Sequence, residues 1–264
     1  MACTSPIRVS KGRSSELFGF LDLPCGYCKS CLLERSRQWS VRIMHEASLW
    51  TVNSFVTLTY DDAFVPDRLD YSHFQGFMRS LRRTRSRVRF FMCGEYGSLT
   101  NRPHFHACLF NVGFDDGLPV CVGAAGDTVF ESAELSKHWK FGFSSYGELS
   151  HRSAAYVARY SLKKSPGSDC FVHMSLKPGI GRGWLDKFKS DVYPHDRVIV
   201  NGKARKPPKY YDNVMYADSS FDSVEFKHLR AKRARLRLVD STYDRLGVIA
   251  HCVDSRLSQL KRSL

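Results

Sequence analysis

Two histidines, His104 and His106, stand one residue apart at the start of an apolar run. On a β-strand, residues two apart point to the same face, so both imidazoles are expected to project together while Phe105 points into a core. Glu95 lies at the end of the preceding predicted strand and can reach that face if the two strands are neighbours. Two imidazoles and one carboxylate are ligands for a divalent cation such as Mg²⁺ or Mn²⁺, and they leave positions open for a substrate oxygen. A histidine pair satisfied by hydrogen bonds alone is the alternative interpretation.

Two tyrosines, Tyr156 and Tyr160, have the spacing that places side chains on one face of a helix, and Lys163 and Lys164 follow one turn later. An amphipathic helix with half-buried tyrosines is the simpler interpretation. Beside a metal site in a basic protein, the pattern favours attack of a tyrosine hydroxyl on a phosphodiester. Because an unperturbed tyrosine has a pKa of about 10, a metal must withdraw charge from the phosphate. Attack then stores the phosphodiester as a phosphotyrosine, and either lysine would stabilise phosphate charge or the leaving oxygen.

Three cysteines, Cys25, Cys28 and Cys31, have metal-ligand spacing, and Cys3 could complete a four-thiolate site. Zinc bound there would be structural, because no other motif connects it to chemistry. Three reduced thiols at the entrance of a helix are the alternative.

The chain is strongly basic, with a formal net charge of +14. Such a charge points first to nucleic acid as the partner. Six arginines lie between Arg79 and Arg89, and we expect five of them to contact DNA phosphates: Arg79, Arg82, Arg83, Arg85 and Arg87. A solvated charged face is the alternative. No apolar run approaches the roughly 18 residues of a membrane span, and no secretory signal begins the chain, so we expect a cytoplasmic protein without a membrane partner.

Apolar periodicity and turn residues predict an α+β protein with a central antiparallel sheet and helices packed on one face. A Cys-containing segment, 1–31, which is loop-like up to residue 24, is expected to precede a core over 32–167, and a basic extension follows over 168–264. The predicted helices span about 32–50, 71–83, 132–140, 150–164 and 224–238, and the predicted strands span 54–60, 88–93, 104–110 and 198–200. The Gly- and Asp-rich segment 111–127 is expected to be a loop.

Several of these motifs occur together in an order that resembles a known family. They are Phe55-Val-Thr-Leu-Thr-Tyr60, Pro103-His-Phe-His106 and Tyr156-Val-Ala-Arg-Tyr160, supported by Cys25-Gly-Tyr-Cys28, Glu34-Arg-Ser-Arg-Gln-Trp39 and Phe91-Met-Cys-Gly-Glu-Tyr-Gly97. Over about residues 20–165 the chain resembles the HUH superfamily of rolling-circle replication initiators, and especially those of microviruses of the gokushovirus branch.

The resemblance implies an HUH endonuclease core with an RRM/ferredoxin-like fold. It implies that His104 and His106 bind a metal, that Glu95 is the third ligand, and that Tyr156 and Tyr160 are nucleophiles. The protein would nick duplex origin DNA, remain on the 5′ end, leave a 3′-OH for a host DNA polymerase and later rejoin the displaced single strand. No nucleotide-binding loop occurs in the sequence, so a host helicase would separate the strands in the bacterial cytoplasm. The alternatives are a non-catalytic nucleic-acid-binding protein, or a relaxase or transposase of the same superfamily.

Overall fold

The computed structural model describes residues 3–10, 20–97, 101–123, 126–160, 169–236 and 238–259. The chain forms two compact units, one made of Met1–Arg37 with Lys209–Leu264 and the other of Gln38–Pro208. The predicted domain boundaries after residues 31 and 167 stay predictions.

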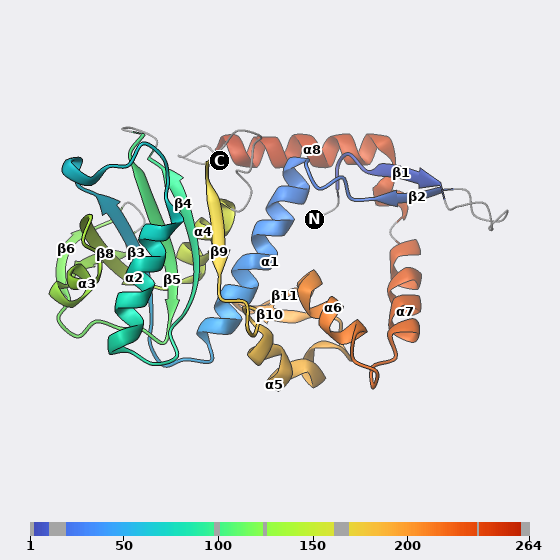
Figure 1. Ribbon diagram of the computed structural model, residues 1–264. Coiled ribbons are helices and arrows are strands. Elements are labelled where there is room, and N and C mark those ends of the chain that lie inside the picture. Colours follow the sequence, from blue (N-terminus) through green and yellow to red (C-terminus); the bar gives the residue numbers. More distant parts are fainter. Residues whose placement is uncertain are drawn as a thin grey trace. The chain divides into compact units, whose positions relative to one another are not determined.

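A seven-stranded sheet forms the centre of the larger unit (Figure 1). Its strands follow the order β6 (Leu118–Val122), β7 (Thr128–Glu131), β8 (Gly142–Glu148), β3 (Asn53–Tyr60), β5 (Pro103–Phe110), β4 (Arg89–Tyr96) and β9 (Phe171–Met174). All the pairings are antiparallel. The predicted α+β class with a central antiparallel sheet is therefore confirmed.

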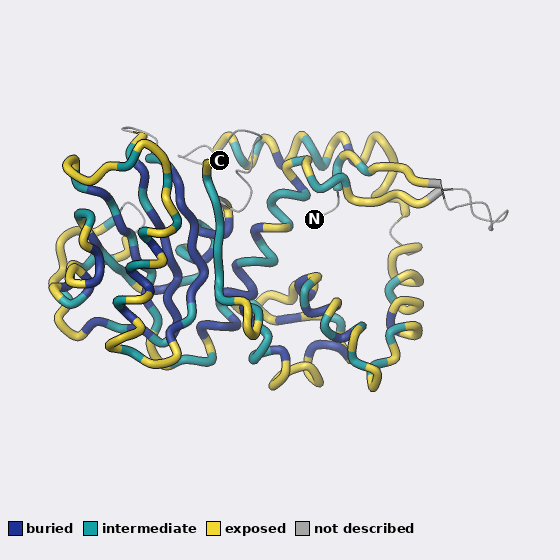
Figure 2. The backbone as a smooth tube through the Cα atoms, viewed as in Figure 1, coloured by how far each residue is buried: buried dark blue, intermediate teal, exposed yellow. Residues whose placement is uncertain are grey.

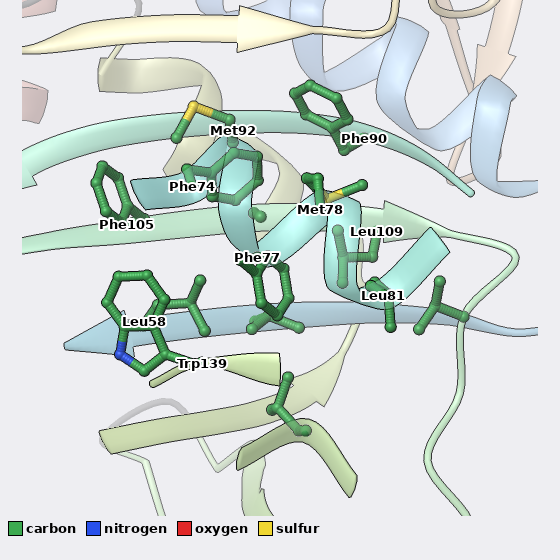
Figure 3. Close-up of a cluster of buried hydrophobic side chains, with 14 of the residues drawn as sticks. Leu58, Phe74, Phe77, Met78, Leu81, Phe90, Met92, Phe105, Leu109 and Trp139 are labelled. Atoms are coloured by element: carbon green, nitrogen blue, oxygen red, sulfur yellow. The ribbon is translucent and has the colours of Figure 1, made fainter. Parts of the chain in front are cut away.

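One face of this sheet is covered by α2 (Tyr71–Thr84) and α3 (Ala133–His138), which contribute to a large apolar core. Its side chains come from α2 (Phe74, Phe77, Met78 and Leu81), from α3 and its C-terminal end (Leu135 and Trp139), and from the strands (Leu58, Met92, Phe105 and Leu109 among them) (Figure 3). The hydroxyl of Ser132 caps α3 by accepting the backbone N–H of Leu135.

The other face also carries helices, so the prediction of helices on one face only was wrong. Ile43 and Ala47 from α1 (Lys29–Ala47) and Ala154 and Val157 from α4 (His151–Tyr160) form a second core there. The reason lies in the unbroken apolar run Phe90–Cys93, whose alternate side chains point to opposite faces and need cover on both. Figure 2 shows β4 and β5 buried along most of their length.

Several elements escaped prediction. The segment 111–127 is not all loop, because it contains the exposed edge strand β6, which includes Pro119. The sequence of β8 is rich in Gly and Ser and poor in β-branched residues, yet it pairs with β3 along its whole length. A neighbouring buried strand outweighs weak local propensity in both cases. Beyond residue 168 the larger unit adds α5 (Arg182–Val192) and a hairpin of β10 (Val198–Val200) and β11 (Lys203–Arg205), which confirms the predicted strand at 198–200.

The smaller unit contains the hairpin of β1 (Ile7–Ser10) and β2 (Phe20–Leu23), the first turns of α1, and α6 (Lys209–Tyr216), α7 (Ser223–Arg235) and α8 (Tyr243–Ser258). The hairpin corrects the expectation of a loop-like start, since strand pairing satisfies a segment whose sequence carries little apolar pattern. The basic helix predicted over 224–238 is confirmed as α7. None of the helices in the described ranges is both long and apolar enough to span a membrane.

Candidate metal and nucleophile site

The histidine pair lies near the start of β5, and the strand register carries it to the face expected from its spacing. His104 is directly opposite Glu95 on β4 and Thr59 on β3. Phe105 points the other way into the α2 core. The prediction that Glu95 and the two imidazoles share one face is confirmed.

Both imidazoles converge on one carboxylate oxygen. The Nε2 atom of His104 lies 3.1 Å, and that of His106 2.9 Å, from Oε1 of Glu95. Glu95 and His106 are only 3% and 7% exposed. Burial raises the pKa of Glu95, but hydrogen bonds and charge interactions with the two histidines outweigh it, so the pKa lies below its usual value. Burial lowers the pKa of His106 and favours the neutral ring that a metal requires.

The second nitrogen of each imidazole is also held. Nδ1 of His104 lies 3.1 Å from the carbonyl oxygen of Arg102, and Nδ1 of His106 lies 3.0 Å from Oγ1 of Thr57. A carbonyl only accepts, so Nδ1 of His104 carries the proton, and Nε2 of the neutral ring presents its lone pair to Glu95. Two electron-rich atoms at this separation need a cation between them, and adjacent ligands of an octahedral site with bonds of about 2.1 Å lie about 3.0 Å apart. The donor set therefore fits a divalent metal.

Phe55 and Thr57 belong to the site although they were not predicted as site residues. The Phe55 ring is stacked on that of His106, with centroids 5.6 Å apart and planes 9° apart. Both residues alternate with the buried Val56 and Leu58, so the period of two in this strand was the signal that could have placed them on the histidine face.

Tyr156 reaches the site from α4. Its hydroxyl donates a hydrogen bond to Oε1 of Glu95 at 3.2 Å, and its ring meets that of His106 edge-on at 5.1 Å. Ala154, Val157 and Ala158 form the buried face of the helix. Tyr160 ends α4, but its side chain lies outside the described part of the chain, as do Lys163 and Lys164 entirely.

The arginine segment lies on the other side of the sheet. It occupies the C-terminal end of α2 and the turn into β4, whereas Glu95 is six residues further along β4, about 20 Å away. Arg85 forms an ion pair with Glu134 at 2.7 Å, and Arg82 donates to the carbonyl oxygen of Val88 at 3.1 Å. The other three predicted phosphate contacts, Arg79, Arg83 and Arg87, are exposed.

The four predicted cysteine ligands come together in the smaller unit. Sγ of Cys3 lies 3.6 Å from that of Cys25 and 3.8 Å from that of Cys28, and the Sγ atoms of all four, Cys31 included, lie within 4.8 Å of one another. The backbone N–H groups of Cys25 and Cys28 donate to Sγ of Cys3 and Cys25, each at 3.3 Å. Burial raises the pKa of Cys28, but hydrogen bonds with Thr4 and Cys31 outweigh it and lower the pKa to about 6.

Comparisons with known proteins agree on one family. The family of replication-associated proteins typified by ORF2 matches residues 53–165. The chain is 30% identical over 286 residues to replication-associated protein VP4 of Bdellovibrio phage phiMH2K, covering 97% of this chain and 90% of that protein. It is 29% identical to replication-associated protein ORF2 of Spiroplasma virus 4 (89% of this chain, 87% of that protein). It is 28% identical to replication-associated protein ORF4 of Chlamydia phage 1 (80% and 58%). No solved structure matches the chain.

Proposed function

Because this chain belongs to the family of microvirus replication-associated proteins, we propose that it is the endonuclease that nicks the origin and starts rolling-circle replication. The observation that carries the proposal is the convergence of three groups on one atom. Tyr156 and both imidazoles contact Oε1 of Glu95, so a phosphate bound at this point would meet a metal and a nucleophile together.

Each side chain then has a distinct role. Held by His104, His106 and Glu95, a divalent cation such as Mg²⁺ or Mn²⁺ would withdraw charge from the scissile phosphate and stabilise the transition state. The Tyr156 oxygen attacks phosphorus, and the hydrogen bond to Glu95 orients the hydroxyl and offers an acceptor for its proton. The bond from phosphorus to the 3′ oxygen breaks, the 3′ oxygen takes up a proton, and the 5′ end remains on the tyrosine.

Rejoining is the reverse reaction, in which a 3′-OH attacks the phosphotyrosine and frees the Tyr156 hydroxyl. Tyr160, one turn along α4, would attack the next junction while the first tyrosine still holds an end. Lys163 or Lys164 would stabilise the developing phosphate charge.

The partners follow from this activity. We propose single-stranded and duplex origin DNA as substrates, with Arg79, Arg83 and Arg87 contacting phosphates away from the site, and a host helicase and DNA polymerase acting on the opened strand. All of this would take place in the cytoplasm of the bacterial host.

We also propose a structural zinc ion on Cys3, Cys25, Cys28 and Cys31. Four thiol sulfurs within 4.8 Å match a tetrahedral Cys₄ site. Gly26 supports it, because its φ of 81° lets the chain turn tightly between the first two cysteines of the Cys25–Cys31 motif. The β1–β2 hairpin beside it has only two strands, and such a hairpin is marginal in water without further support.

Covalent adduct formation tests the nickase. Purified protein is incubated with Mn²⁺ and tiled single-stranded fragments of the genome that encodes it, and adducts are resolved on denaturing gels. We expect an adduct with one fragment that is lost when Tyr156 and Tyr160 are both replaced by Phe and kept in Tyr243→Phe, an exposed tyrosine of the smaller unit. A shifted but uncut strand would support the non-catalytic binder, and adducts restricted to foreign transfer or transposon ends would support the relaxase or transposase.

A further inference from the structure

An exposed aromatic side chain lies on the metal-site face, two strands from the histidines. Phe143 of β8 is 64% exposed, although it belongs to the central sheet of the larger unit. Its register partner is Thr59 of β3, and the partner of Thr59 on its other side is His104. Directly opposed residues of antiparallel strands point to the same face, so Phe143, Thr59, His104 and Glu95 form one row across the sheet.

The row spans a short distance. Neighbouring strands lie about 4.8 Å apart, which places the backbone of Phe143 about 10 Å from that of His104. The next row of this face on the same two strands holds Ser145 and Thr57, which are half-buried. Between the ring and the metal ligands the sheet therefore offers small side chains over which a flexible strand can pass.

The backbone holds Phe143 in a defined place. Gly142 has a φ of 147°, and a Cβ atom there would lie 2.2 Å from the backbone nitrogen of Asp61. The N–H of Asp61 in turn donates to the carbonyl oxygen of Phe141 at 2.8 Å. This close crossing fixes the start of β8, so the Phe143 ring is presented to solvent from a rigid position, which reduces the entropy lost on binding.

We propose that Phe143 is a stacking platform for a base of the single-stranded DNA whose scissile phosphate enters the metal site. This rests on the proposed function, which requires such a strand at His104. Among the described residues, the Phe143 ring contacts no other aromatic ring, so its π-face is open to a base. The strongly basic chain supplies the charge complementarity that a polyanionic strand needs.

Binding without cleavage tests this inference. Fluorescein-labelled dT15 is titrated with protein in EDTA at one fixed salt concentration, and anisotropy gives Kd. We expect Phe143→Ala to weaken binding about 5- to 30-fold, since stacking on one aromatic side chain contributes about 1–2 kcal/mol. Phe143→Trp should bind like the wild type and Phe143→Leu should resemble the alanine variant. The control Phe188→Ala, which removes an exposed phenylalanine from α5, should leave Kd unchanged.

Photocrosslinking gives a second readout. A dT15 carrying 5-iodouracil is irradiated with the protein, and the attached peptide is identified by mass spectrometry. Attachment at Phe143 supports the proposal. Unchanged Kd in Phe143→Ala, full rescue by Phe143→Leu, or attachment only elsewhere overturns it. The outcome is separable from that of the nickase: a protein that binds through Phe143 but forms no adduct refutes the nickase alone, and an adduct-forming protein indifferent to Phe143 refutes this inference alone.

Discussion

The hydroxyl of Tyr156 lies 3.2 Å from Oε1 of Glu95, although 61 residues separate the two in the chain. The same oxygen receives both imidazoles, so one atom links the candidate nucleophile to the candidate metal ligands. Removing its charge should therefore affect both at once.

We expect Glu95→Gln to reduce Mn²⁺ affinity by more than about 100-fold and to abolish adduct formation, because the amide is a neutral and weaker ligand and a poorer acceptor for the tyrosine proton. Isothermal titration calorimetry measures the first effect and denaturing gels the second. The matched control is Glu131→Gln, which alters an exposed carboxylate at the end of β7. Undiminished Mn²⁺ binding by Glu95→Gln would remove Glu95 from the ligand set.

Thr57→Val should lower Mn²⁺ affinity by about 10- to 100-fold, since Oγ1 orients the His106 ring through Nδ1 and outer partners of metal ligands have effects of this size. Saturating Mn²⁺ should restore the adduct rate, as expected for a positioning residue. The half-buried Thr128 of β7 provides the control, and Thr128→Val should behave like the wild type. A rate that stays low at saturating Mn²⁺ would contradict a role confined to metal binding.

Arg89→Ala should destabilise the larger unit by about 3–5 kcal/mol. Its Nε lies 2.6 Å from Oε1 of Glu46, and the two side chains are only 14% and 2% exposed, so the substitution leaves a buried carboxylate without its main partner. Thermal unfolding followed by near-ultraviolet circular dichroism measures the loss. Arg182→Ala, which breaks the exposed pair with Asp186, should cost no more than about 0.5 kcal/mol. Equal shifts in the two variants would show that burial is not what makes the pair with Glu46 matter.

Replacing Arg79, Arg83 and Arg87 together by Ala should flatten the dependence of log Kd on log salt concentration for single-stranded DNA by about 2, because each phosphate contact contributes about 0.7. The adduct rate at saturating DNA should stay within about twofold, since these arginines lie across the sheet from Tyr156. The triple Lys variant keeps the charge and should keep the slope. A slope equal to that of the wild type in the alanine variant would leave the arginines as a solvated face.

Protein purified without chelators should contain about one zinc ion per chain, and Cys28→Ser should contain none, as measured by inductively coupled plasma mass spectrometry. The smaller unit should then exchange its amide hydrogens faster, because metal binding contributes to its folding free energy. Cys252→Ser, at an exposed position of α8, should retain the metal. Wild-type protein free of zinc, with unchanged exchange on zinc addition, would rule out the site.

Relations within one element, or between strands adjacent in the chain, could be read from the residues alone. His104 and His106 share a face because a strand repeats every two residues, and the positions of Tyr156 and Tyr160 follow from the 3.6-residue turn of a helix. Glu95 could be added because β4 and β5 are consecutive and antiparallel. These rules are local, so no knowledge of the remaining chain was needed.

Only the tertiary structure decided which distant elements meet. The crossing of α4 over the sheet brings Tyr156 to Glu95, the pairing of β3 with β5 sets Thr57 beneath His106, and β8 becomes a strand because β3 offers it hydrogen-bonding partners. The same packing separates the α2 arginines from the site by a whole sheet. Such contacts depend on the order of strands and on the layers that cover each face, which no local repeat in the sequence contains.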